Sequence, residues 1–450
     1  MGIYFGTDGV RGIAGKELTN ELAYKLGRYG AYVITKHSPR EKARLILGKD
    51  TRVSSYMLES AMIAGILSAG CDVVQVGVIP TPGIAHLVKT EGFDGGIMVS
   101  ASHNSYEYNG IKFFNEKGLK LTDKIEEEIE SYITGERSID KEILGDAIGR
   151  LEIRKELRAK YLAHAEELCH EDLGSLRILL DTANGATHKL GPLAFKAMGA
   201  KVDVIFNSPN GVNINDMCGS THLGTLSKKV VKGGYDLGLA FDGDGDRVLA
   251  IDSLGREVDG DGIMAICALD LLERGELKNE GLVATVMSNL GFLNYMKEKG
   301  VDVTIAPVGD RYVLEKMLEG GQILGGEQSG HVILLHKNTT GDGIQTGLLL
   351  ASALIKSGKS LAAWRDEIPK LPQYLTNARV SKDKQGLYKE LARAQKKIKE
   401  IEDILGDRGR VLIRPSGTEP LIRVMLEGPE EDLIKDLAEQ LKEIYLEELA

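Results

Sequence analysis

Three segments of the chain repeat the same order of apolar and polar positions. Each begins with a short apolar run that is typical of a buried strand, at residues 45–48, 178–181 and 282–285. A helical stretch follows and closes on a glycine, which is Gly70, Gly199 or Gly300. A second apolar run comes directly afterwards, at residues 71–77, 200–206 and 301–307. This order predicts three β-α-β units with parallel strands.

Each unit continues into a third predicted strand that runs into a polar loop. The strand at 95–99 leads to Ser102, and the strand at 237–241 leads to Asp242. In the third unit the strand at 322–324 leads into the Gly-Gly-Glu sequence that ends at Glu327. Ligands of open α/β sheets bind beyond the carboxyl ends of the strands. We therefore expect the three loops to converge on one cleft.

The pattern changes after Trp364. Pro369 and Pro372 bracket a predicted linker. Apolar side chains then recur at helical spacing, at Leu387, Leu391, Ala394, Ile398, Ile401 and Leu405. A short coiled coil is one interpretation, but six positions are too few heptads, so a helix packed on a small sheet is favoured. Strands are expected at residues 411–413 and 421–425, around the loop RPSGTEP, before a charged terminal helix.

The predicted fold class is therefore α/β. It comprises three similar α/β domains with mixed, largely parallel sheets and a C-terminal α+β domain, arranged around a central cleft. The expected domains are residues 1–150, 151–254, 255–368 and 369–450. A chain of 450 residues is long enough for several hydrophobic cores.

Composition narrows the possible functions. The formal net charge of −10 argues against a surface for nucleic acid or anionic membrane, although a buried cationic cluster can still hold a phosphorylated small molecule. The four cysteines are far apart, which indicates reduced thiols and no zinc site. The N-terminus carries no export or lipidation motif, and no apolar run approaches the roughly 20 residues that span a bilayer. A soluble cytoplasmic protein is expected.

The sequence FDGDGDR places Asp242, Asp244 and Asp246 at alternate positions, separated by glycines. The glycines let the backbone curl so that the three carboxylates face one point, which suits a hard divalent cation. A calcium-binding EF-hand loop is the nearest competing interpretation. It fails because Arg247 and Ser253 occupy the positions that require glycine and glutamate.

A second group of polar residues lies in the sequence RPSGTEP and just after it. Two guanidinium groups, two hydroxyls and a glycine amide are typical of a phosphate-binding loop, supplied here by Arg414, Ser416, Gly417, Thr418 and Arg423. A plain Ser-Gly turn with surface arginines is the alternative. In GGEQSGH, Glu327 and Ser329 can recognise neighbouring sugar hydroxyls, unless this stretch is only a glycine-rich turn.

Ser102 alone is weak evidence of function, because serine is common in turns. Arg11 and Lys112 are candidates for polarising a hydroxyl or phosphate near Ser102. A bound nucleotide is not expected, because neither residues 356–360 nor residues 243–248 match a nucleotide-binding motif. The sequence thus offers a serine nucleophile, a metal-binding loop, a phosphate-binding loop and a loop that can recognise sugar hydroxyls. Together these favour phosphoryl transfer to a sugar phosphate. A Mg²⁺-dependent phosphatase that uses the same serine, and a non-catalytic protein that binds cations and sugars, remain alternatives.

With these motifs in their order, FGTDGVRG, SASHN, FDGDGDR, GGEQSGH and RPSGTEP, the whole chain resembles the α-D-phosphohexomutase superfamily. Gln328 and the segment 209–222 resemble the branch that acts on glucosamine phosphates, since relatives acting on glucose or mannose phosphates usually carry Met in place of Gln. Ser105 departs from the proline found in many relatives, so the serine loop is expected to be less rigid.

The resemblance implies an isomerase of amino sugar metabolism that interconverts glucosamine 6-phosphate and glucosamine 1-phosphate through a 1,6-bisphosphate. Such an enzyme feeds UDP-N-acetylglucosamine synthesis, and thus cell-envelope precursors. A phosphoglucomutase or phosphomannomutase is the alternative within the superfamily. Sugar phosphates are the expected partners, a hexose 1,6-bisphosphate is the expected activator, and a homodimer is left open. No nucleic acid or membrane partner is expected.

The resemblance also implies roles for individual residues. Ser102 is carried as phosphoserine, and Mg²⁺ is held by its phosphate and by Asp242, Asp244 and Asp246. Arg247 steadies the phosphoserine, while Glu327 and Ser329 hold sugar hydroxyls. The residues of the phosphate loop hold the phosphate that is not reacting. Lys112 is a general acid/base candidate, supported by Arg11 and His331.

Overall fold

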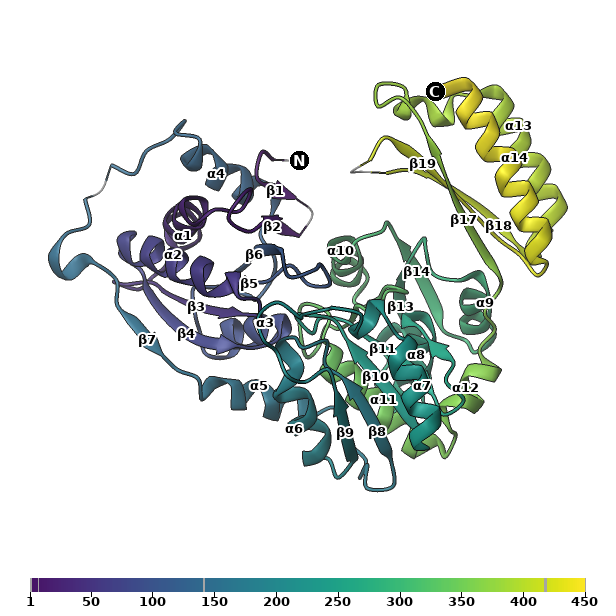
Figure 1. Ribbon diagram of the computed structural model, residues 1–450, viewed down its shortest axis with the longest axis horizontal. Coiled ribbons are helices and arrows are strands. Elements are labelled where there is room, and N and C mark those ends of the chain that lie inside the picture. Colours follow the sequence, from purple (N-terminus) through teal and green to yellow (C-terminus); the bar gives the residue numbers. More distant parts are fainter. Residues whose placement is uncertain (1, 7, 141, 417–418, 450) are drawn as a thin grey trace. The chain divides into compact units, whose positions relative to one another are not determined.

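The computed structural model describes residues 2–6, 8–140, 142–416 and 419–449 (Figure 1). The chain forms two compact units. The first comprises the chain up to Met287 together with Lys299–Glu367, and the second comprises Ser288–Glu298 and the chain from Ile368 onward. The expected α/β class with a C-terminal α+β domain is confirmed.

The first sheet has seven strands in the order β1-β2-β6-β5-β3-β4-β7. Strands β3, β4, β5 and β7 are parallel, whereas β1, β2 and β6 join by antiparallel pairs. The strands are β1 (Phe5–Gly6), β2 (Gly9–Ile13), β3 (Arg44–Lys49), β4 (Asp72–Val78), β5 (Gly95–Val99), β6 (Tyr108–Asn115) and β7 (Leu151–Ile153).

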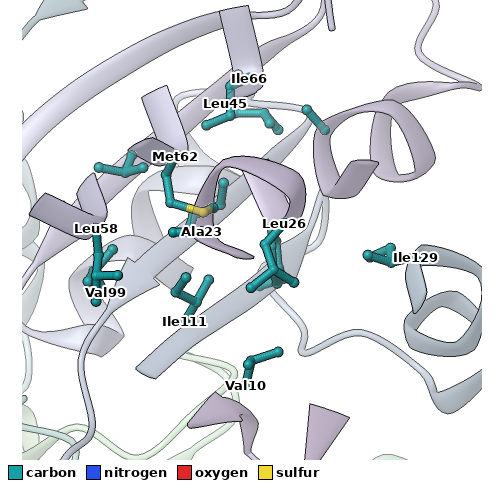
Figure 2. Packing of buried hydrophobic residues seen from close by; sticks show 14 of the residues in the cluster. Val10, Ala23, Leu26, Leu45, Leu58, Met62, Ile66, Val99, Ile111 and Ile129 are labelled. Carbon is teal, nitrogen blue, oxygen red and sulfur yellow. The ribbon is translucent and has the colours of Figure 1, made fainter. Parts of the chain in front are cut away.

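Helices cover both faces of this sheet because successive strand residues point to opposite sides. Leu45 and Leu47 of β3 pack in a core with helices α1 (Asn20–Thr35), α2 (Ser54–Ser68) and α4 (Asp123–Ile133) (Figure 2). Ile46 points the other way, toward α3 (Thr81–Thr90), which also packs against α5 (Leu157–Glu166). Helix α3 is therefore buried along most of its length.

The second and third sheets repeat one plan. The second has the order β12-β11-β10-β8-β9, and the third has the order β14-β13-β15-β16. Their strands are β8 (Arg177–Asp181), β9 (Lys201–Ile205), β10 (Leu237–Phe241), β11 (Val248–Asp252), β12 (Glu257–Val258), β13 (Gly281–Thr285), β14 (Asp302–Ala306), β15 (Leu324–Gly326) and β16 (Val332–Leu334). Their helices are α6 (Leu190–Ala197), α7 (Gly224–Gly233), α8 (Gly260–Glu273), α10 (Asp310–Gly320), α11 (Gly343–Ser357) and α12 (Leu361–Glu367).

The three predicted units with parallel strands are present. In each, the central strand pairs in parallel with the second and third strands of its unit. Gly70, Gly199 and Gly300 all adopt positive φ after their helices, as expected of helix-terminating glycines. The third unit differs from expectation in one detail, since β15 begins at Leu324 and includes two residues of the predicted loop.

Each third strand is followed by an antiparallel fourth strand that the sequence pattern did not reveal. The pairs are β5 with β6, β10 with β11, and β15 with β16. The three polar loops are therefore the connections between these pairs. The four cysteines are buried, and none of them forms a disulfide within the described residues.

In the second unit, the order β17-β19-β18 forms an antiparallel sheet from β17 (Gln373–Arg379), β18 (Arg410–Pro415) and β19 (Leu421–Glu427). Helices α13 (Ala392–Leu405) and α14 (Glu431–Leu449) share a core with this sheet, as predicted in preference to a coiled coil. The helix starts later than its apolar spacing suggested, because Leu387 lies in a 3₁₀ turn. Helix α9 (Leu290–Glu298) also belongs to this unit.

No helix in the described part of the chain is both long and apolar enough to cross a membrane.

Candidate active site

Ser102 lies in the loop between β5 and β6, and only 1% of its surface is exposed. Its φ is +50°, a left-handed conformation that non-glycine residues rarely adopt. The Ser102 hydroxyl donates a hydrogen bond of 2.6 Å to Asp242 Oδ2, from the loop between β10 and β11. Two of the three predicted loops thus meet at the serine.

The three aspartates of that loop are buried, with one carboxylate oxygen of each within 4.8 Å of the others. Burial, together with the charges of Asp246 and Asp244, raises the pKa of Asp242 well above its ordinary value. Asp244 Oδ1 and Asp246 Oδ1 accept no hydrogen bond from the described residues. Buried carboxylate oxygens that lack donors and repel one another fit a hard divalent cation such as Mg²⁺.

Arg247 follows the aspartates directly. Its backbone N–H donates to Asp242 Oδ1 at 3.2 Å, and its guanidinium Nε lies 3.8 Å from Asp246 Oδ1. The side chain keeps a positive charge beside the acidic loop, because the neighbouring carboxylates outweigh the effect of burial on the pKa of Arg247.

Lys112 projects from β6 into the same acidic cluster and is almost fully buried. Its Nζ lies 3.0 Å from Asp244, 3.0 Å from Asp8 and 3.5 Å from Asp246. Although burial lowers the pKa of Lys112, these carboxylates raise it above the ordinary lysine value. Lys112 is therefore a cation in this arrangement.

Asp8, Lys120 and Asp310, to which the sequence assigned no role, also join this cluster. Lys120 forms ion pairs with Asp8 and Asp310, and Asp8 also pairs with Arg11. Burial raises the pKa of Asp8, but Lys112, Lys120 and Arg11 outweigh it and hold that pKa well below the ordinary range. Lys120 and Asp310 carry no local motif, and only their long-range pairing marks them.

Thr81, at the start of α3, is another residue that the sequence pattern missed. Its hydroxyl donates to Asp244 Oδ2 at 2.6 Å, and its backbone N–H donates to the Asp244 carbonyl at 2.9 Å. It therefore fixes the middle aspartate of the acidic loop from the first domain. An Ile-Pro-Thr-Pro sequence offered no chemical signal for this role.

His331 is buried at the end of the third loop. The Gly341 N–H donates to His331 Nε2 at 2.9 Å, so a neutral ring carries its proton on Nδ1, which lies 3.7 Å from Asp246 Oδ2. Burial lowers the pKa of His331, but Asp246 and Asp310 raise it, and the net direction is upward. His331 thus contacts the acidic cluster as expected.

Glu327 is half-buried in the same loop and accepts the Gly309 N–H at 3.0 Å on Oε1. Burial lowers the pKa of both Arg247 and His331. The charge of Glu327 raises both pKa values, less than Asp246 and Asp242 do for Arg247 and less than Asp246 and Asp310 do for His331. Ser329 is exposed on this loop. All three predicted loops therefore bring polar groups to one region of the first unit.

The predicted phosphate loop joins β18 to β19 in the second unit. Arg414 and Arg423 stand directly opposite each other in this antiparallel pair. Like charges directly opposite each other across strands are destabilising. Ser416 is buried and accepts the Glu419 N–H at 3.3 Å, whereas Gly417 and Thr418 lie outside the described residues.

Gln385 supports this loop and was not predicted. Its amide Nε2 donates to the carbonyls of Ser416, Glu419 and Leu421 at 2.9, 3.1 and 2.8 Å. One side chain thereby holds both ends of the turn. Gln385 lies 31 residues before Ser416, so its partner could not be read from the sequence.

Four family models match the chain in order, and together they span most of it. They describe phosphoglucomutase/phosphomannomutase α/β/α domain I at residues 2–140, domain II at 159–255, domain III at 259–371 and the C-terminal domain at 375–444. The chain belongs to the phosphoglucomutase/phosphomannomutase family. This membership confirms the superfamily resemblance and the expectation of an isomerase.

Curated relatives from the phosphoglucomutase/phosphomannomutase family match along the full chain. A phosphoglucosamine mutase of Caldicellulosiruptor saccharolyticus is 51% identical over 443 residues, covering 98% of each chain. A phosphoglucosamine mutase of Acetivibrio thermocellus is 50% identical over 453 residues, covering 100% of each. A crystal structure of a phosphoglucomutase/phosphomannomutase family protein from Burkholderia thailandensis shares the fold. Its TM-score is 0.80 at 22% identity, with 98% of this chain and 96% of that chain covered.

Proposed function

We propose that this protein is a phosphoglucosamine mutase that interconverts glucosamine 6-phosphate and glucosamine 1-phosphate. The observation that carries the proposal is the buried Ser102 hydroxyl, hydrogen-bonded at 2.6 Å to Asp242 of the aspartate triplet. It occurs in a chain about half identical to phosphoglucosamine mutases over its whole length. A phosphoryl carrier beside a cation site is what such a reaction requires.

In the proposed reaction Ser102 enters as phosphoserine. The bond between phosphorus and Ser102 Oγ breaks while phosphorus bonds to the free hydroxyl oxygen of the sugar phosphate. The hydroxyl proton passes to a base in the site, and Ser102 regains a proton as it becomes a hydroxyl. The resulting 1,6-bisphosphate returns its other phosphate to Ser102, so no water is consumed.

Mg²⁺ is the proposed cofactor, which Asp242, Asp244, Asp246 and the phosphate on Ser102 would hold. When bound, it supplies positive charge that stabilises the oxygens of the transferring phosphoryl group. Arg247 is placed to hold the same group. Lys112 is the proposed acid/base residue, supported by Arg11 and His331, and as a cation it would act as the acid that supplies the Ser102 proton. These side chains belong to the charged cluster around Asp242, which contacts Ser102, and this supports positioning as the main source of catalysis.

Substrate recognition is proposed for the remaining residues. Glu327 and Ser329 would hold sugar hydroxyls. Charge-assisted hydrogen bonds from Arg414 and Arg423, with Ser416, Gly417 and Thr418, would hold the phosphate that is not reacting. Gln328 supports glucosamine over glucose or mannose, since it matches the branch of the family that uses amino sugars. The four domain ranges given above, a homodimer and a cytoplasmic location remain part of this proposal.

An isomerisation assay over glucosamine, glucose and mannose phosphates tests the function. We expect glucosamine 6-phosphate to be converted most efficiently, with stimulation by a hexose 1,6-bisphosphate and loss of activity in Ser102→Ala. Intact mass should show one phosphoryl group on the unchanged protein and none on the variant. Full activity of Ser102→Ala would refute the mechanism, and phosphate release without isomer formation would indicate a phosphatase instead.

A further inference from the structure

Two buried side chains hold the serine loop by the same two carbonyl oxygens. The Arg52 guanidinium donates to the carbonyls of Ser102 and Asn104 at 3.2 and 2.6 Å. The Asn215 amide donates to the same two carbonyls, at 2.9 Å each. Arg52 precedes α2 in the first domain, and Asn215 lies in the second. Each of the two domains therefore contributes a side chain that binds the serine loop.

Arg52 is fully buried against the serine loop. It pairs with Asp50, which also accepts the hydroxyls of Ser100 at 2.6 Å and Ser55 at 2.8 Å. The Ser100 hydroxyl in turn accepts the Ser102 N–H at 3.1 Å. The chain of contacts therefore fixes both the N–H and the carbonyl of Ser102.

Asn215 also brings the serine loop close to the aspartate loop. Its amide nitrogen and the Ser102 carbonyl both lie against Gly243, where an added Cβ would come within 2.7 and 2.5 Å of them. Gly243 belongs to the aspartate loop. The close approach thus couples the serine loop, the aspartate loop and the segment around Asn215.

Backbone strain is concentrated at this junction. Among the described residues, eight non-glycine residues have positive φ, and six of them belong to the serine loop and the loops bonded to it: Ser102, Ala183, Asn184, Phe206, Asn215 and Met217. These loops are linked by the bonds Asn215 N–H to Ala183 O and Asn184 N–H to Phe206 O. Strained conformations persist only where surrounding contacts enforce them.

We propose that Arg52 and Asn215 are positioning residues that hold Ser102 in its left-handed conformation, with Oγ directed at Asp242. Neither side chain contacts the reacting oxygen, and both act through the carbonyls of the loop. The pair also fixes the carbonyl of Asn104, directly before Ser105. The role in phosphoryl transfer rests on the proposed function, whereas the ordering of the loop does not.

Asn215→Gly tests the proposal because glycine accepts the φ of +58° at this position and only the amide is lost. Asn279→Gly is a matched control. Asn279 has a φ of +57° and its amide donates to the Gly320 carbonyl at 2.8 Å, in a loop that contains no proposed site residue. Arg52→Lys is the companion variant, since one ammonium group cannot span Asp50 and both carbonyls.

We expect Asn215→Gly to lower kcat at least tenfold while the KM for glucosamine 6-phosphate changes less than threefold. Amide hydrogen exchange in a peptide covering residues 99–108 should become at least fivefold faster. Asn279→Gly should change neither kcat nor amide hydrogen exchange in this peptide. Arg52→Lys should reproduce both effects, and if it fails to fold, Asn215→Gly alone decides the outcome.

The proposal is overturned if Asn215→Gly matches Asn279→Gly within twofold in both kcat and loop exchange. It is also overturned if only one of the two quantities changes, because positioning requires a mobile loop and a slower transfer together. Absence of isomerase activity in the unchanged enzyme would overturn the proposed function instead. The rate of amide hydrogen exchange in residues 99–108 would then decide by itself whether Arg52 and Asn215 order the serine loop.

Discussion

Asp242, Asp244 and Asp246 show what a cluster of like charges costs at the scale of single residues. All three are buried, and the pKa of Asp242 is raised by burial and by its two neighbours. Buried carboxylates are unfavourable unless a cation compensates them. Lys112 pairs with Asp244 and Asp246, so the remaining cost of burying a carboxylate falls mainly on Asp242.

Asp242→Asn should raise the thermal midpoint in chelator by a few degrees, because one repulsive charge is removed. It should abolish the further stabilisation that Mg²⁺ gives the unchanged protein, and lower kcat by about a hundredfold or more. Thermal unfolding with EDTA and with Mg²⁺ measures the first two effects. Asp216→Asn, an exposed residue of the same domain, is the charge-matched control. A variant that still gains stability from Mg²⁺ would contradict the assignment.

His86 provides a pH dependence away from the site. Its ring stacks on His164 with centroids 3.9 Å apart. Burial, followed by the charge of His164, lowers the pKa of His86 to about 4. Because the unfolded chain takes up this proton near pH 6.5 and the folded protein only near pH 4, stability is present above pH 6.5 and is lost as pH falls between these values.

His86→Phe keeps an aromatic ring and removes the proton uptake. We expect the free energy of unfolding of the unchanged protein to fall between pH 6.5 and 4 by on the order of 1–3 kcal/mol more than that of the variant. Denaturant titrations at several pH values measure this difference. His37→Gln, at an exposed histidine, should leave the pH dependence unchanged. Parallel pH profiles for His86→Phe and the unchanged protein would contradict the expectation.

At the scale of elements, helices α1 and α2 pack closely because each presents a glycine to the other. A Cβ added to Gly65 would lie 2.2 Å from the Tyr24 carbonyl oxygen, and one added to Gly27 would lie 2.5 Å from the Met62 carbonyl oxygen. Backbone atoms cannot move aside as a flexible side chain can. This helix pair covers the face of the sheet that contains the first core (Figure 2).

Gly65→Ala should therefore destabilise the protein by about 1–3 kcal/mol, although alanine favours helix. The thermal midpoint, followed by circular dichroism, should fall by several degrees. Gly224→Ala places the same substitution in α7, where nothing lies within 4 Å of an added Cβ, and should be neutral or slightly stabilising. Equal midpoints for the two variants would show that α1 and α2 can separate at little cost.

At the scale of the whole molecule, the second unit is assembled from two separate parts of the sequence. Glu427 on β19 is fully buried and accepts the Leu290 N–H at 3.0 Å at the start of α9. It also accepts the Arg410 guanidinium at 2.6 Å and the Gln373 amide at 3.1 Å. One carboxylate thus connects α9 to the sheet that carries the phosphate loop.

Glu427→Ala should destabilise the second unit by about 2–4 kcal/mol, because it leaves Arg410 Nε and the Leu290 N–H without their acceptor. Hydrogen exchange should accelerate in peptides from residues 288–298 and 410–427 and stay unchanged in peptides from β3 and β5. Glu447→Ala, which removes an exposed ion pair with Arg393, is the control and should have little effect. Uniform acceleration over both units would contradict the division of the chain.

Sequence alone was sufficient for features that depend on neighbouring residues. Apolar runs and terminating glycines identified the three repeated units, because strand and helix periods are local properties. The order of motifs identified the family, and the spacing of Asp242, Asp244 and Asp246 predicted the cluster of carboxylates that the structure contains. The missed strands β6, β11 and β16 are short or follow a functional loop directly, so their apolar pattern was masked by the motif beside them.

Tertiary structure alone decided which groups surround Ser102. Arg52, Thr81, Lys120, Asn215 and Asp310 carry no recognisable motif, yet they bond the serine loop, the aspartates or the lysine cluster. Their partners lie between 50 and 190 residues away in sequence. Hydrogen bonds and ion pairs act over a few ångströms in space, so the charge state of Lys112 and the conformation of Ser102 depend on contacts that only folding creates.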